Sequence, residues 1–295
     1  MKVSVCITTY NHEKYIAQAI ESVLMQKTDF DFEIIIGEDD SSDNTRDISK
    51  EYKAKHPEKI NLFLNDRANV IYINGKPTGR WNFINNLKHA QGEYIALLEG
   101  DDYWTDSCKL QKQADYLDAH PECALCFHDV QAVYDNELRE PETLTPINKK
   151  EVYALEDIIK GNFIHTCSVM FRNGLFGDFP DWFYSTPMAD WPLHILNAQY
   201  GDIGYIRDIM GAYRIHKGGI WSTTDLIYKL EKTVVVYQII NAHLNYRYKK
   251  ILKSHIRYYK FKIAEKKIGL FLIERGLHGF VHLYRKIFYP SSPAE

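Results

Sequence analysis

Residues 92–104 read GEYIALLEGDDYW, and the expected fold class follows from this stretch. Its first half, Tyr94 to Leu98, is short and apolar, as expected for a buried strand. Its second half places Glu99, Asp101 and Asp102 directly after that strand. In an open parallel sheet, ligands bind beyond the carboxyl ends of the strands. The stretch therefore predicts a buried strand that delivers carboxylates to a ligand-binding edge.

Repeated strand and helix signals surround this stretch. Short apolar, β-branched runs predict further strands at residues 2–9, 32–36 and 61–64. Apolar residues at helical spacing and polar capping residues predict helices at residues 13–26, 42–55, 81–90 and 107–120. Such strand–helix–strand units imply a Rossmann-like α/β fold, in which a mostly parallel central sheet is flanked by helices.

The alternation loosens after residue 120. We expect strands at 124–134, 166–171 and 203–213, helices at 152–160 and 190–199, and a surface loop at 141–149. From residue 225 onwards the chain is expected to be helical. That last part contains eight tyrosines and 14 lysines and arginines against 5 acidic residues, which leaves a net charge of +9, whereas the whole chain carries −3. The two parts are therefore expected to do different jobs.

The composition is that of an ordinary globular protein. Of 295 residues, 45% are hydrophobic and 25% are charged, which excludes disorder and coiled coil as the main state. No stretch approaches eighteen consecutive apolar residues, so we expect neither a membrane-spanning helix nor a secretory signal. Five scattered cysteines suit a reducing, cytoplasmic setting. Cys123 and Cys126 have redox or zinc spacing, but their apolar strand and the lack of a second pair favour buried structural thiols.

Polar residues also follow two of the upstream strands. The first ends in the sequence TTYNH at residues 8–12, and the second ends in Glu38, Asp39 and Asp40. Clustered carboxylates repel one another and resist desolvation, so they imply a counter-charge such as Mg²⁺ or Mn²⁺, which commonly bridges substrate phosphates. The turn after the first strand lacks the glycines of a dinucleotide-binding loop, and no P-loop is present. A carboxylate-bound metal is then the expected way to hold a nucleotide.

Three motifs in this order, at residues 3–11, 37–45 and 92–104, resemble family 2 glycosyltransferases. The resemblance covers roughly residues 1–222 and implies a GT-A catalytic domain, with a nucleotide-sugar half at about 1–105 and an acceptor half at about 106–222. It also implies an inverting enzyme of bacterial polysaccharide or lipopolysaccharide assembly. Such an enzyme uses a nucleotide-diphosphate sugar, Mn²⁺ or Mg²⁺, and an acceptor hydroxyl on a glycan or a lipid-linked saccharide. Residues 223–295 would form a basic, tyrosine-rich helical C-terminal extension.

The resemblance implies roles for residues on the donor side. Thr8, Thr9 and Tyr10 would line the nucleoside pocket, and Asp39 would hydrogen-bond the base. Asp101 would lie at the ribose and the sugar. Each of these residues occupies the matching place in the motifs of this chain.

The resemblance also implies a metal site and an acceptor side. Asp102 would bind the metal that holds the diphosphate, and His216, in a late R-x-H loop, would complete the metal or diphosphate site. Asp190 would be the general base; its alternative role is to cap a helix ahead of a proline. His165 and Trp191 fall in the acceptor region, where plain packing is an equally good interpretation of His165.

The chain departs from the family pattern at two positions. The usual D-x-D motif has Glu99 as its first acidic residue, which leaves its contact with the sugar open. Asp40 stands where glycine usually follows the early acidic pair, and it adds negative charge near the site.

Two other functions stay open. A catalytically silent nucleotide-sugar-binding or scaffold protein would use the same donor residues and transfer nothing. A nucleotidyltransferase shares a related α/β architecture, but its glycine-rich signature after the first strand is missing here.

Three interpretations fit the basic C-terminal helices. They are a peripheral contact with an anionic membrane surface, expected on the inner face of the cell membrane, a contact between copies of the chain, and an ordinary solvated surface. Nucleic acid is not an expected partner, because no nucleic-acid-binding module is recognised.

Overall fold

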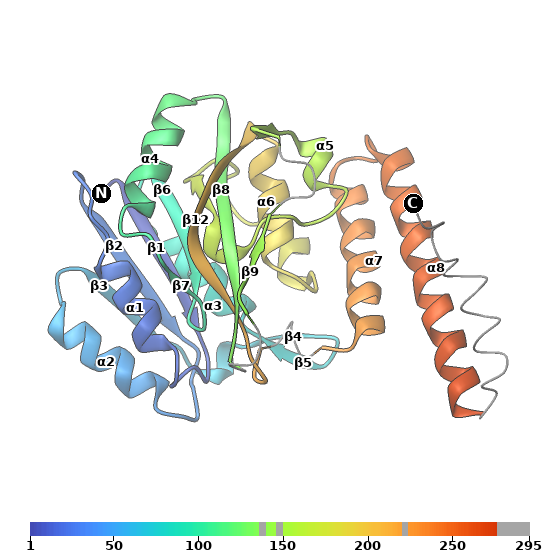
Figure 1. Cartoon of the computed structure of the whole chain (residues 1–295), viewed down its shortest axis with the longest axis horizontal. Coiled ribbons are helices and arrows are strands. Elements are labelled where there is room, and N and C mark those ends of the chain that lie inside the picture. The colour runs from blue at the N-terminus through green and yellow to red at the C-terminus, as the bar shows by residue number, and fades with distance from the viewer. Residues whose placement is uncertain (136–139, 146–149, 220–223, 276–295) are drawn as a thin grey trace. The chain divides into compact units, whose positions relative to one another are not determined.

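Four parallel strands form one half of the central sheet in the computed structural model, which describes residues 1–135, 140–145, 150–219 and 224–275 (Figure 1). These strands are β1 (Val3–Thr9), β2 (Phe32–Glu38), β3 (Ile60–Leu64) and β6 (Tyr94–Glu99). Thr8 of β1 is in register with Gly37 of β2 and with Glu99 of β6. The polar sequences that follow these strands therefore emerge at one edge of the sheet.

The other half of the sheet mixes strand directions. The strand order is β10-β12-β8-β11-β6-β1-β2-β3. The long strands β8 (Cys123–Tyr134) and β12 (Asp202–Ile215) are parallel, and β11 (Met170–Arg172) runs antiparallel between β8 and β6. Three short strands pair antiparallel with this half: β7 (Tyr103–Trp104), β9 (Glu142–Leu144) and β10 (Val152–Tyr153). A separate hairpin joins β4 (Ile71–Ile73) to β5 (Lys76–Thr78).

Helices flank the sheet (Figure 1). They are α1 (Ile16–Leu24), α2 (Thr45–Lys55), α3 (Arg80–His89), α4 (Lys109–Ala119), α5 (Leu155–Ile158) and α6 (Asp190–Ala198). Apolar side chains of α1 and α4 share one core with the strands. On α3, Asn82 and Asn86 donate hydrogen bonds to the carbonyls of Gly37 and Ile7 at 2.8 and 2.9 Å, which fastens this helix to β2 and β1. The predicted α/β fold, with a mostly parallel sheet flanked by helices, is confirmed.

Three expected elements differ from the structure, all of them in the second half. The expected loop at 141–149 contains β9, and residues 146–149 lie outside the described residues. The expected helix at 152–160 divides into β10 and the short helix α5. The expected strand at 166–171 begins as a 3₁₀ turn (Thr166–Ser168), and β11 follows. Pairing with distant strands decides these short segments, and local periodicity does not report such pairing.

The cysteines at 123 and 126 are buried free thiols of β8. Burial raises the pKa of the Cys126 thiol to about 12, so it stays protonated and unreactive near neutral pH. These two residues pack in the core, as expected.

The chain divides into two units, Met1–Ser222 and Thr223–Glu295. In the second unit, α7 (Leu226–His243) and α8 (Lys249–Glu274) pack against each other. The Tyr237 ring is buried, and its centroid lies 5.6 Å from those of His255 and Tyr259. Among the described residues, no helix combines the length and the apolar character needed to cross a bilayer.

Candidate active site

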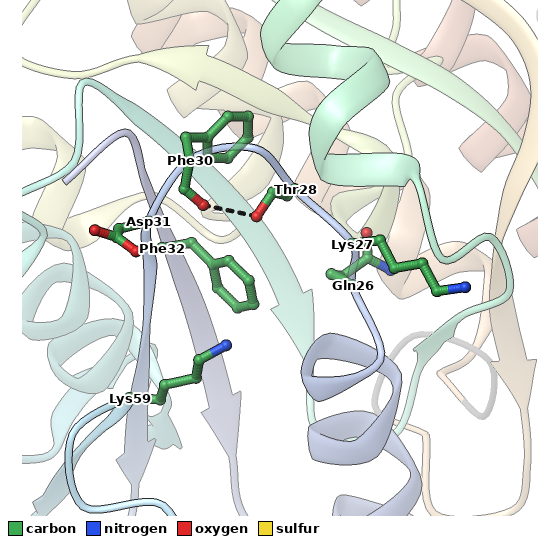
Figure 2. Close-up of a pocket in the computed structure, with 7 residues that line it drawn as sticks. All are labelled: Gln26, Lys27, Thr28, Phe30, Asp31, Phe32 and Lys59. Atoms are coloured by element: carbon green, nitrogen blue, oxygen red, sulfur yellow. Dashed lines mark hydrogen bonds between the residues drawn. The ribbon is translucent and has the colours of Figure 1, made fainter.

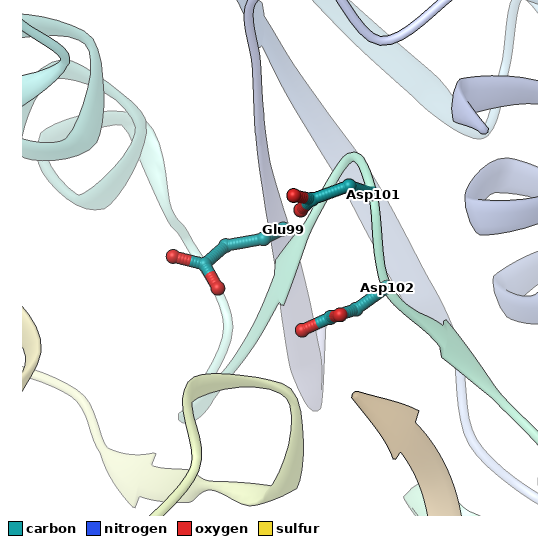
Figure 3. Close-up of side chains that lie close together, drawn as sticks. All are labelled: Glu99, Asp101 and Asp102. Carbon is teal, nitrogen blue, oxygen red and sulfur yellow. The ribbon is translucent and has the colours of Figure 1, made fainter. Parts of the chain in front are cut away.

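The acidic turn after β6 gathers three carboxylates. Glu99 ends β6, and Asp101 and Asp102 precede β7 (Figure 3). One oxygen from each carboxylate lies within 4.8 Å of the others. Asp102 is 1% exposed, and its Oδ1 accepts a 2.8 Å hydrogen bond from the backbone N–H of Arg214. Its buried Oδ2 has no hydrogen-bond partner of ordinary geometry among the described residues, although the neighbouring Cys167 side chain helps to hold down the pKa of Asp102. This orphaned oxygen points to a missing ligand.

The electrostatics of this cluster favour a bound cation. Burial, followed by the charge of Asp101, raises the pKa of Asp102 well above its usual range. Burial and the charges of Asp102 and Asp101 do the same to the pKa of Glu99. Three neighbouring carboxylates resist simultaneous ionisation without a counter-charge. Oxygen ligands suit Mg²⁺ or Mn²⁺, so the residues present fit a divalent cation.

Two histidines flank Asp101. Nε2 of His216 lies 3.0 Å from Oδ2 of Asp101, and Nε2 of His12 lies 3.7 Å from the same oxygen. Burial of Asp101 opposes its charge, but the hydrogen bond to His216 and the charges of His12 and His216 hold the pKa of Asp101 below its usual value. The sequence grouped His216 with Asp102, whereas the structure brings it to Asp101. His12, on the loop after β1, was not among the predicted residues.

The predicted nucleoside residues lie together at the ends of β1 and β2. Thr8 and Thr9 end β1, Tyr10 follows with 38% of its surface exposed, and Asp39 is 3% exposed. The guanidinium of Arg67 lies 4.6 Å from the centre of the Tyr10 ring, and its Nη1 lies 3.5 Å from Oδ2 of Asp39. Burial raises the pKa of Asp39, and the charge of Arg67 opposes that shift. Sequence reasoning missed Arg67, which is far from any motif.

Hydrogen bonds tie the loop after β1 to the loop after β2. Oδ1 of Asn11 accepts from the backbone N–H of Ser42 at 2.9 Å, and the Asn11 N–H donates to Oγ of Ser41 at 2.9 Å. The N–H of His12 donates to Oγ1 of Thr45 at 2.7 Å. Asn11 and Asp40 adopt left-handed backbone conformations, with φ of 55° and 59°. Because glycine adopts this conformation most easily, the angle explains why glycine is usual at the place of Asp40.

Asp190 is the first residue of α6, one residue after the N-cap Ala189. Its Oδ2 accepts a 2.8 Å hydrogen bond from Nδ2 of Asn162. Burial raises the pKa of Asp190, while the backbone N–H of Trp191 and the charge of Arg80 oppose this shift. The charge of Asp190 in turn contributes to the raised pKa of Glu99, so the two carboxylates are electrostatic neighbours. The Asp190 carboxylate is thus a partly exposed group with a raised pKa, and its charge acts on the acidic turn.

His165 and Trp191, the predicted acceptor-side residues, are largely packed. Trp191 is 2% exposed, and its indole N–H donates to the carbonyl of Ile158 at 2.7 Å. The His165 ring lies 5.4 Å from the Tyr213 ring, and burial lowers the pKa of His165 to about 4. In this structure the Trp191 indole therefore joins α6 to α5 and does not line an open surface.

A cavity of about 420 Å³ lies elsewhere, at the amino-terminal ends of the strands (Figure 2). Phe32, the first residue of β2, lines it together with Lys27, Asp31 and Lys59. Asp39 follows the opposite end of the same strand. This cavity is therefore separate from the acidic turn.

Two solved glycosyltransferase structures share this architecture. Residues 1–349 of Staphylococcus aureus TarS, crystallised in complex with UDP-GlcNAc, superpose with a TM-score of 0.58 at 23% identity, over 82% of this chain and 67% of that fragment. The mannosyltransferase PcManGT from Pyrobaculum calidifontis, in complex with GDP-Man and Mn²⁺, gives 0.56 at 14% identity, over 97% of this chain and 82% of that protein. The fold is thus the GT-A glycosyltransferase fold.

Sequence comparison identifies the family. The profile described as glycosyl transferase family 2 matches residues 4–176, and the chain belongs to this family. The uncharacterized protein Rv1520 of Mycobacterium tuberculosis is 36% identical over 219 residues, which cover 74% of this chain and 60% of that relative. The putative teichuronic acid biosynthesis glycosyltransferase TuaG of Bacillus subtilis is 29% identical, over 75% of this chain and 81% of TuaG. The chain thus spans 60% of the length of its mycobacterial relative.

Proposed function

We propose that this chain is an inverting glycosyltransferase that moves a sugar from a nucleotide-diphosphate sugar to an acceptor hydroxyl during synthesis of a surface polysaccharide or lipopolysaccharide. One observation supports this proposal above all. The acidic turn of Glu99, Asp101 and Asp102 shares a sheet edge with Tyr10 and Asp39, and the charge of Asp190, a partly exposed carboxylate, acts on Glu99 of that turn. The named activity of the TuaG relative supports the polysaccharide context.

The donor would be held from two sides. The face of Tyr10 offers a stacking platform to the base, and Asp39, which shares the neighbouring Arg67 with Tyr10, offers a hydrogen-bond acceptor. Asp102, with Glu99 and Asp101 beside it, would hold Mn²⁺ or Mg²⁺. A divalent cation there supplies Lewis-acid stabilisation of the negative charge that develops on the departing diphosphate.

Asp190 would accept the proton of the acceptor hydroxyl as that oxygen attacks the anomeric carbon. The new carbon–oxygen bond forms as the bond between the anomeric carbon and the diphosphate oxygen breaks, through an oxocarbenium-like transition state. A single displacement of this kind inverts the anomeric centre. Burial keeps the pKa of Asp190 above the ordinary aspartate value, which makes its carboxylate a stronger base.

The first test is a thermal-shift screen of UDP-, dTDP-, GDP- and CMP-sugars, with and without Mn²⁺. A ligand that binds only the folded state raises the unfolding temperature, and the rise grows with its affinity and, logarithmically, with its concentration. We expect stabilisation by one nucleotide class, and stronger stabilisation with Mn²⁺. Release of free nucleotide from the selected donor, accelerated by an acceptor, then measures transfer. Binding without release or transfer would identify a silent nucleotide-sugar-binding protein.

Two substitutions separate binding from chemistry. Asp190→Asn should lower turnover ~10²-fold or more, the scale of a single acid–base group, and should leave the thermal shift with donor and Mn²⁺ unchanged. Asp102→Asn should weaken that thermal shift as well. Asp181→Asn, at an exposed aspartate of the same unit, is the matched control. Near-normal transfer by Asp190→Asn would refute its role as the base.

A further inference from the structure

One face of α8 presents a row of exposed cations. Lys250, Lys253, Arg257 and Lys260 follow one another at spacings of three, four and three residues, so they lie along one face of the helix. All four are exposed, and none forms an ion pair with a described carboxylate. We call these four residues the basic row. Unpaired like charges so close together repel one another, which a negatively charged partner would relieve.

Carboxylates are absent from the exposed part of this helix, as far as its described side chains reach. Glu265 is 1% exposed, and one of its oxygens lies 3.1 Å from Nζ of Lys262. Oε1 of Glu231, on α7, lies 2.8 Å from Nζ of Lys267. Because Glu231 pairs with Lys267, it does not neutralise the basic row. The exposed face of α8 is therefore positive along its first half.

Apolar side chains continue the same face toward the end of the helix. Ile268 lies eighteen residues after Lys250, which is five full turns of a helix with 3.6 residues per turn. Phe271 follows three residues later. Both side chains therefore lie on the same face of α8 as the basic row. Ile268 is 47% exposed and Phe271 is 52% exposed. A helix that combines lysine and arginine heads with exposed large apolar side chains is typical of a helix lying in a membrane interface.

We propose that this face of α8 docks reversibly on an anionic phospholipid surface. The basic row would contact the lipid phosphates, while Ile268 and Phe271 would enter the boundary between headgroups and acyl chains. A soluble polyanion would match the cations but would leave both apolar side chains in water, so the lipid surface fits more of the observed face. The helix would lie along the surface. The proposal is independent of the transfer reaction.

The test is sedimentation of the full chain with lipid vesicles of two compositions. We expect binding to vesicles that contain phosphatidylglycerol, weaker binding as salt rises, and little binding to pure phosphatidylcholine. Replacing all four residues of the basic row with Gln should lower partition into anionic vesicles ~10²–10³-fold, since each basic residue near such a surface contributes roughly fivefold. A control with Lys27, Lys50, Lys55 and Lys88 replaced by Gln removes the same charge from exposed sites of the first unit.

A second variant tests the apolar end of the face. Ile268→Gln combined with Phe271→Gln should lower partition at least ~10-fold, because two partly buried apolar side chains are lost from the interface. Leu64→Gln with Tyr72→Gln, at exposed apolar sites of the first unit, should bind like the parent. Circular dichroism and unfolding temperature check that each variant is folded. Equal partition of the basic-row variant and its control, or equal binding to neutral vesicles, would overturn the proposal. The proposal would also fail if the apolar variant bound anionic vesicles as well as the parent and polyphosphate displaced the protein from them. That result would indicate a site for a soluble polyanion.

Discussion

Arg80 shows how a buried charge acts on a neighbouring group. Its side chain is 4% exposed, and its Nη2 donates to the carbonyl of Thr186 at 2.8 Å. Its Nε and Nη1 have no hydrogen-bond partner among the described residues. Burial lowers the pKa of this guanidinium to about 10, and the charge of Asp190 opposes that shift. Desolvation disfavours the charged form of Arg80 and of Asp190, and the opposite charge of each group partly offsets this cost for the other.

The pH dependence of turnover should report this pairing. A general base works only when ionised, so turnover should fall as pH drops through the raised pKa of Asp190. Arg80→Gln removes a charge that opposes the rise, so the acidic limb of the profile should move to higher pH. Arg80→Lys keeps the charge and should move it less. Arg207→Gln, at an exposed arginine, is the control, and an unmoved limb in Arg80→Gln would contradict the assigned pairing.

Asp40 adopts a conformation that aspartate tolerates and β-branched residues do not. Its φ is 59°, and its Oδ1 lies 3.3 Å from Nη1 of Arg46. Asp40→Val should destabilise the fold by about 1–3 kcal/mol, the cost of a strained backbone at such a site. Asp40→Gly relieves the steric conflict and loses only a partly exposed ion pair, so its stability should stay within about 1 kcal/mol of the parent. Urea unfolding midpoints measure both, and a Val variant as stable as the Gly variant would disprove the conformational explanation.

The elements that carry the site could be predicted because their signals are local. The strands β1, β2 and β6 are apolar runs, and polar residues stand at the carboxyl end of each run: Thr-Thr-Tyr at β1 and acidic residues at β2 and β6. Because these strands are parallel, their carboxyl ends meet at one edge of the sheet. Arg67 and His12 were missed because their partners are fixed by how loops fold together, which no local pattern reports. The same holds for β9 and β10, whose short sequences become strands only through pairing with β8 and β12.

The turn between β6 and β7 depends on a residue with no side chain. A Cβ on Gly100 would lie 2.5 Å from Oγ1 of Thr9 and 2.8 Å from Nδ1 of His12. Gly100→Ala should therefore push the acidic turn away from the loop after β1 and lower kcat/KM ~10–10²-fold, since misplacement by about 1 Å has effects of this size. Gly161→Ala, where a Cβ meets no atom within 4 Å, should leave kcat/KM unchanged. Equal activity of the two variants would show that the turn accommodates a Cβ at residue 100 without displacing the carboxylates.

Charge is unevenly distributed over the whole molecule, and the acidic part holds carboxylates whose ionisation burial opposes. Residues 1–224 carry 22 basic against 34 acidic residues, a net charge of −12, in contrast to the +9 of the rest. Within that acidic part, Glu99 and Asp102 have raised pKa values in the folded protein. Without a cation, folding therefore favours their protonated forms, and stability should fall as pH rises from the ordinary carboxyl range toward these raised values.

Mn²⁺ should reverse this loss, because a cation binds the ionised carboxylates and competes with protons for them. The rise in unfolding temperature on adding Mn²⁺ should then grow as pH rises from the ordinary carboxyl range toward these raised pKa values, while the protein with EDTA becomes less stable over the same range. Asp102→Asn removes one of the two titrating groups and the orphaned Oδ2, so its response to Mn²⁺ should be smaller and less dependent on pH. A gain with Mn²⁺ that is equal at both ends of the range, or unchanged in Asp102→Asn, would mean that the cation binds elsewhere. In that case the acidic turn would lose its role in holding the donor, because only a cation bound by these carboxylates links their ionisation to the stability of the fold.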